Sequence, residues 1–158
     1  MKEITYLKGD ATVPQAKETK IIVHICNNIG GWGKGFVLAI SKRWSEPEKS
    51  YREWHRNRAK NDFELGAIQV IQVADYIYVG NMIAQLGIKT RSKGVPIRYE
   101  AVKECLEKIA KEAQLLSASI HMPRIGCGLA GGKWEKIEPI IQKTLIQKEL
   151  DVYVYDFE

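Results

Sequence analysis

The segment Ile21-Ile22-Val23-His24-Ile25 constrains the fold most, because four of its five residues are apolar and β-branched. A strand with one solvent-exposed face alternates polar and apolar residues, whereas a mostly apolar run is typical of a central strand buried on both faces. Further strand-like runs occupy residues 4–7, 67–74, 76–83, 119–122 and 152–155. The chain therefore contains enough strands for a substantial sheet.

Helical patterns lie between these strands. The clearest covers residues 99–116, where apolar side chains recur at steps of three and four and so share one face. Other helices are expected over residues 35–43, from Ser45 to about residue 58, and around 137–148. The sequence Ser45-x-x-Glu48 has the form of a capping box, with Pro47 in the first turn. Alternating strands and helices favour an α/β fold in which a mostly parallel sheet is sandwiched between helices. We expect one domain over residues 1–158.

Two glycine-rich loops follow predicted strands, where α/β sheets bind ligands. The first, residues 26–35, reads CNNIGGWGKG and has four glycines in its last six positions. It precedes a helix, whose free N–H groups favour an anion. Its spacing fits neither the Rossmann nor the P-loop motif. The alternative is a tight turn that binds nothing.

The second loop, residues 123–132, reads PRIGCGLAGG and also connects a strand to a helix. Two such loops at neighbouring strand ends would form a cleft that holds a diphosphate by backbone donors. Cys127 in this loop is either a nucleophile or simply a small residue. We favour the small residue, because no histidine and acid can be assigned as its partners.

Composition excludes several classes of protein. No run of residues is long and apolar enough for a membrane span, and the first residues do not resemble a secretion signal. Three cysteines without a C-x-x-C pair predict reduced thiols in a cytoplasmic protein, without a metal site or a cofactor. The net charge of +5 leaves open a nucleic-acid-binding surface, although a solvated basic surface explains it as well.

Several motifs occur together in a recognisable order. They are Gly9-Asp10, His24-Ile25-Cys26-Asn27, Gly30-x-Trp32-Gly33-x-Gly35 and Met122-Pro123-Arg124-Ile125-Gly126-Cys127-Gly128-Leu129. This ordered set resembles the macro domain family over essentially the whole chain, and it is most similar to the ADP-ribose-1''-phosphate phosphatase branch. The resemblance implies a three-layer α/β/α fold with a mixed, mostly parallel central sheet.

The resemblance also implies residue roles in binding ADP-ribose or a derivative. Asp10 would accept a hydrogen bond from the adenine amino group, as an acceptor-only carboxylate can. Asn27 would lie near the distal ribose, and Trp32 would pack on that sugar or else in the core. The remaining predicted binding residues are Asn28, Gly33, Lys34 and Gly35 in the first loop, and Gly126, Cys127, Gly128, Leu129 and Ala130 in the second.

Departures from the family pattern bear on the reaction. The glycohydrolase branch uses a lysine after the fourth strand and an aspartate in the second loop, where this chain has Gln85 or a neighbour and Ala130. A covalent lysine–aspartate mechanism is therefore not expected. We expect hydrolysis of ADP-ribose-1''-phosphate or of mono-ADP-ribosyl esters by a positioned water, with His24 and Asn27 as candidate catalytic residues. Two alternatives stay open: His24 is a core histidine, and the protein is a non-catalytic reader of ADP-ribosylated protein or nucleic acid.

Overall fold

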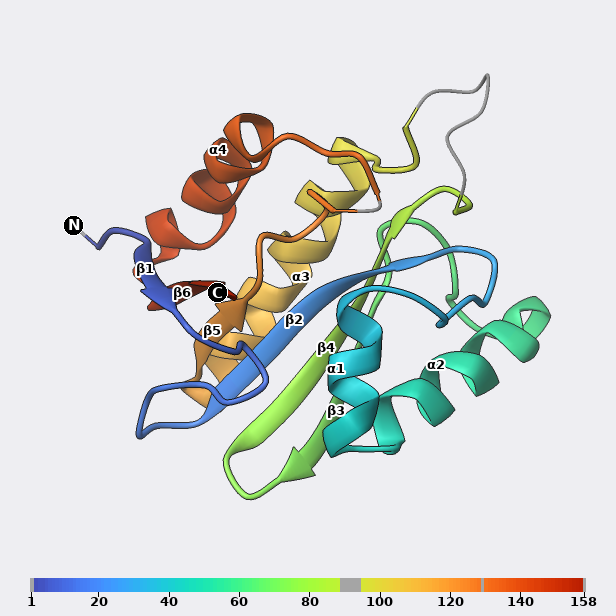
Figure 1. Cartoon of the computed structure of the whole chain (residues 1–158), viewed down its shortest axis with the longest axis horizontal. Coiled ribbons are helices and arrows are strands. Elements are labelled where there is room, and N and C mark those ends of the chain that lie inside the picture. The colour runs from blue at the N-terminus through green and yellow to red at the C-terminus, as the bar shows by residue number, and fades with distance from the viewer. Residues whose placement is uncertain (1, 89–94, 129, 158) are drawn as a thin grey trace.

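A six-stranded sheet organises the molecule. The computed structural model describes residues 2–88, 95–128 and 130–157. The strands are β1 (Thr5–Lys8), β2 (Lys20–Asn27), β3 (Ile68–Ala74), β4 (Ile77–Gln85), β5 (Ser119–Met122) and β6 (Val152–Asp156). Their order across the sheet is β1-β6-β5-β2-β4-β3, with β2 near the centre (Figure 1). Every pairing is parallel except that of β3 with β4, so the sheet is mixed and mostly parallel as predicted.

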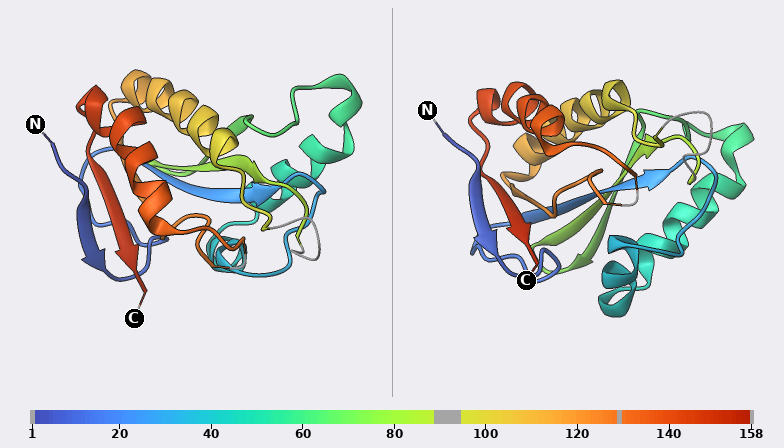
Figure 2. Two further views of the ribbon diagram at one scale, coloured as in Figure 1. Left: turned by 90° about the horizontal axis from the view of Figure 1, so that it is seen from above. Right: turned by 45° about the horizontal axis from the view of Figure 1, so that its top comes forward.

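In the described part of the chain, four α-helices cover the two faces of the sheet. They are α1 (Phe36–Arg43), α2 (Glu46–Arg56), α3 (Tyr99–Leu116) and α4 (Trp134–Thr144), and short 3-10 turns follow at Arg58–Lys60 and Ile146–Lys148. Helices α3 and α4 lie over one face of the sheet and α1 lies on the other (Figure 2). Two apolar clusters fill the spaces between the layers, one under α3 and α4 and one under α1 and α2. The expected three-layer α/β/α architecture is confirmed.

The ends of two helices differ from the sequence-based expectation. Ser45 adopts a helical conformation and makes no side-chain cap, so the predicted capping box does not form. Glu48 instead accepts hydrogen bonds from the Ser41 hydroxyl and from Arg52. Helix α4 begins at Trp134, three residues before the expected start, and Pro139 lies inside it.

The parallel strands direct their carboxyl ends to the same edge of the sheet. β2 and β5 are neighbours, so the loops that follow them are brought face to face. The residues after β1 reach this edge as well, because β1 pairs in parallel with β6. No helix of the described part of the chain is long and apolar enough to cross a membrane.

Candidate functional site

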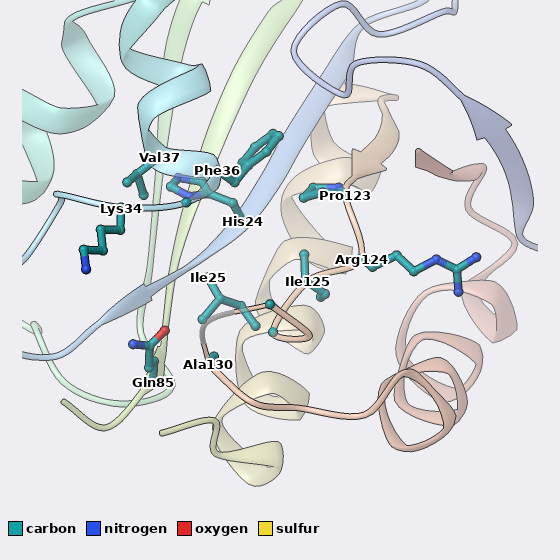
Figure 3. Close-up of a pocket in the computed structure, with 13 residues that line it drawn as sticks. His24, Ile25, Lys34, Phe36, Val37, Gln85, Pro123, Arg124, Ile125 and Ala130 are labelled. Atoms are coloured by element: carbon teal, nitrogen blue, oxygen red, sulfur yellow. The ribbon is translucent and has the colours of Figure 1, made fainter. Parts of the chain in front are cut away.

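The two glycine-rich loops enclose a cleft at the carboxyl ends of β2 and β5. This central cleft has a volume of about 280 Å³ (Figure 3). Its walls come from β2, the first loop, the start of α1, Gln85 at the end of β4, and the second loop. The residues that line it are His24, Ile25, Lys34, Gly35, Phe36, Val37, Gln85, Pro123, Arg124, Ile125, Gly126, Gly128 and Ala130.

A second, outer cleft adjoins the first. It has a volume of about 680 Å³, and Phe36 and Pro123 line both clefts. The residues that follow β1 form one wall, including Asp10, while α1 and Tyr155 form others. The two clefts thus meet at Phe36 and Pro123, and the two glycine-rich loops flank the central one.

Backbone geometry suits the central cleft to an anion. Gly35 precedes α1 with φ of 86°, and no side chain caps this helix. An uncapped helix N-terminus presents N–H groups and the positive end of the helix dipole. Gly126 in the opposite loop has φ of 73°, and a Cβ there would lie 2.7 Å from Ile97. Glycine is therefore required for the path of the second loop.

His24 lies on the floor of the central cleft and is only 1% exposed. The Asn81 amide nitrogen donates to the carbonyl of Pro47 and to Gln69, so its oxygen is left to accept from His24 Nε2 at 2.6 Å. This arrangement places the proton on Nε2 and a lone pair on Nδ1. Burial lowers the pKa of His24 to about 4, which keeps the ring neutral near pH 7. Nδ1 has no hydrogen-bond partner among the described residues.

The chain resembles known proteins in sequence and in fold. The family model of the Macro domain matches residues 23–141. The chain belongs to the macro domain family. A protein of unknown function from Bacteroides thetaiotaomicron is 57% identical, with a TM-score of 0.94 and 98% of each chain covered. A macrodomain protein from Streptomyces coelicolor is 53% identical, with a TM-score of 0.88 and coverage of 98% of this chain and 99% of that one.

Curated relatives include proteins of very different length. The chromodomain-helicase-DNA-binding protein 1-like of Danio rerio is 35% identical over 96% of this chain, which spans only 15% of that helicase. The ADP-ribose 1''-phosphate phosphatase of Lodderomyces elongisporus is 26% identical, over 97% of this chain and 99% of the phosphatase. The chain thus matches a small part of one relative and nearly the full length of another.

The structure brings only some of the predicted site residues of this macro domain to the clefts. His24, Lys34, Gly35, Gly126, Gly128 and Ala130 line the central cleft, and Asp10 lines the outer cleft. Gly33 is an exposed part of the first loop, outside the lining. Leu129 lies outside the described residues.

Asn27 is occupied within its own loop. Its oxygen accepts from the backbone N–H groups of Ile29 and Gly31 at 3.0 Å, and its amide nitrogen donates to the Gly31 carbonyl. The Tyr51 hydroxyl also donates to the same oxygen. Asn27 therefore holds the first loop in shape, and its contact with the distal ribose stays a prediction. Asn28 similarly accepts from the backbone of Gly87.

Trp32 and Cys127 have their side chains outside the cleft lining. The Trp32 indole is 3% exposed, donates to the Ser41 hydroxyl at 2.7 Å and packs beside His24 and Tyr51. The structure thus favours a role for Trp32 in packing of the protein core over a contact with the distal ribose. Cys127 donates to the carbonyl of Ile125, and burial raises the pKa of its thiol, which opposes a role as nucleophile.

Sequence reasoning missed residues that depend on packing between distant segments. Phe36, Ala39 and Arg43 line the outer cleft together. Their spacing of three and then four residues places them on one face of α1, and this pattern could have been recognised in the sequence. Thr12, buried in the same cleft wall, carried no such pattern.

Proposed function

We propose that this macro domain binds ADP-ribose across the two clefts and hydrolyses a bond at the distal ribose. The observation that carries this proposal is the central cleft between two glycine-rich loops, continuous with an outer cleft that presents Asp10. The backbone donors of the loops would hold the diphosphate, and the Asp10 carboxylate would receive the adenine amino group. Proposed substrates are ADP-ribose-1''-phosphate and mono-ADP-ribosyl esters, and the name of the Lodderomyces relative supports the first.

His24 is the side chain best placed to assist hydrolysis. The lone pair on its Nδ1 needs a donor, and a ribose hydroxyl or an attacking water would provide one. Because Asn81 fixes the tautomer, the ring would orient that donor without first losing a proton. The role of Asn27 would be to hold the loop that carries the diphosphate.

A reader function is the second candidate, favoured by the residues at the cleft. Ala130 and Gln85 both line the central cleft and supply neither a carboxylate nor an amine. We accordingly propose that no covalent lysine adduct forms during any reaction. A reader would bind ADP-ribose as tightly as the proposed enzyme would, whether the ligand is free or attached to protein or nucleic acid. It would hydrolyse neither proposed substrate.

Calorimetry with ADP-ribose tests binding, and assays of product release from ADP-ribose-1''-phosphate and from an ester-linked ADP-ribosyl peptide test hydrolysis.

The variant His24→Gln tests the role of the histidine. It retains an N–H for Asn81 but removes the imidazole. We expect it to lower kcat by roughly 100-fold, the scale of one general acid or base, with affinity for ADP-ribose nearly unchanged. Lys49→Gln on the exposed side of α2 is the control and should behave as wild type. Tight binding without release from either substrate would establish the reader instead.

A further inference from the structure

The Asp10 carboxylate is held by a chain of hydrogen bonds that begins on α1. Arg43 Nε donates to the Thr12 hydroxyl at 2.7 Å, and that hydroxyl donates to Asp10 Oδ1 at 2.7 Å. The Thr12 backbone N–H donates to the same oxygen at 2.8 Å. A hydroxyl has one hydrogen and two lone pairs, so this relay satisfies Thr12 in both directions.

The two oxygens of Asp10 consequently differ. Oδ1 already accepts two short hydrogen bonds from Thr12, whereas Oδ2 has the Arg43 guanidinium 3.7 Å away. Oδ2 is therefore the oxygen with more unused acceptor capacity, on a residue that lines the outer cleft. Thr12 is only 3% exposed, so its hydroxyl cannot turn to water without disrupting the wall of the cleft.

The charge state of Asp10 follows from the same contacts. Burial alone would raise the pKa of this carboxyl, but the hydrogen bonds from Thr12 and the nearby Arg43 outweigh it and lower the pKa below the usual value. Asp10 thus remains an ionised acceptor-only group at neutral pH. Such a group accepts from the amino group of adenine and repels the carbonyl oxygen that hypoxanthine carries at the same position.

We propose that Thr12 and Arg43 are positioning residues that set the base preference of this site by orienting Asp10. The inference rests on the proposed binding of ADP-ribose. Neither residue needs to touch the base, because the relay Arg43–Thr12–Asp10 holds the carboxylate with Oδ1 engaged and Oδ2 left to accept. Loss of the relay lets the carboxylate rotate, and the preference for adenine over hypoxanthine falls.

Calorimetry with ADP-ribose and with inosine diphosphate ribose tests the relay. Thr12→Val removes the hydroxyl at nearly constant shape, and Arg43→Lys keeps the charge but loses the fork that reaches both partners. We expect both variants to lower the ratio of the two affinities by about tenfold, as for the loss of one hydrogen bond to a charged group. Two controls should keep the wild-type ratio of the two affinities. Thr12→Ser retains the hydroxyl, and Lys49→Gln removes a distant charge.

The outcomes separate this inference from the proposed function. An equal loss of affinity for both ligands in Thr12→Val and Arg43→Lys would show a merely structural role and overturn it. An unchanged ratio would overturn it as well. If the wild type binds neither ligand, the proposed function itself fails.

Asp10→Ala tests whether Asp10 is the group that recognises the base. It should abolish the preference for adenine in a protein that still binds ADP-ribose; a retained preference would mean that another group recognises the base. Should Thr12→Val not fold, Arg43→Lys alone decides, since its side chain is 43% exposed.

Discussion

Asn27 shows how one amide can organise a ligand loop. Its oxygen accepts from two backbone N–H groups and from Tyr51, and its nitrogen donates to a carbonyl four residues on. The residue is only 8% exposed, so water cannot replace these bonds at low cost. The shape of the first loop therefore depends on Asn27 before any ligand is bound.

Asn27→Ala should reduce stability as well as binding. We expect a loss of about 1–3 kcal/mol in the free energy of unfolding, the cost of leaving buried polar groups unpaired, together with weaker affinity for ADP-ribose. Urea unfolding and calorimetry measure the two effects. Tyr51→Phe is the matched variant, since it removes a single donor to Asn27 and should have a smaller effect on the loop. Normal stability with lost turnover would instead show that Asn27 acts only on the substrate.

The glycines of the two loops differ in how much space surrounds the position that a side chain would occupy. A Cβ added at Gly33 or Gly128 meets no atom within 4 Å, whereas at Gly126 it would meet Ile97 at 2.7 Å. Gly126 also has a positive φ, which side chains rarely adopt. Gly126 is thus needed for the fold, while Gly33 and Gly128 leave space that a ligand can approach.

Gly128→Val should abolish binding of ADP-ribose, because Gly128 lines the central cleft, and Gly33→Val, beside the lining residue Lys34, should weaken it. Both variants should keep thermal stability within about 0.5 kcal/mol, as for exposed substitutions elsewhere. Gly126→Val, by contrast, should destabilise the protein markedly. Titration with ADP-ribose and thermal unfolding of all three variants check this. Near-normal affinity in both Gly33→Val and Gly128→Val would mean that the loops are only turns.

The elements differ in how well the sequence predicted them. Helix α3 and strand β5 match their predicted ranges, because strong periodicity and burial act together over each. The capping box at Ser45 does not form, and Glu48 is instead bound by Arg52 in the same helix and by Ser41 in α1. The contact with Ser41 joins neighbouring helices, and a local motif does not contain it. Trp32 and Asn27 illustrate the same limit within the site, since a loop motif does not specify which side chains turn inward.

At the scale of the whole molecule, two buried histidines couple folding to pH. His24 has its pKa lowered to about 4 by burial, and His121 has its pKa lowered to about 3 by burial and by Lys20. His121 bonds Ser119 and the Tyr155 hydroxyl and stacks on Tyr153, so it is held between the interior strands β5 and β6. Both rings are neutral in the folded protein and become protonated near pH 6.5 once unfolded.

The sign of the effect follows from proton binding. Between pH 6.5 and 4 the unfolded chain binds protons at both histidines that the folded protein does not bind, so stability must fall as the pH falls. We expect a slope of about 1.4 kcal/mol per pH unit for each histidine within that window. Urea unfolding between pH 7.5 and 4.5 measures it. His121→Asn should lower the slope by about half, although it also lowers stability at neutral pH. His55→Gln, at a half-buried position whose pKa is lowered by burial and by Arg58, should change the slope less than His121→Asn does. A stability that is flat over this range would mean that the two rings gain protons in the folded state, which their burial opposes.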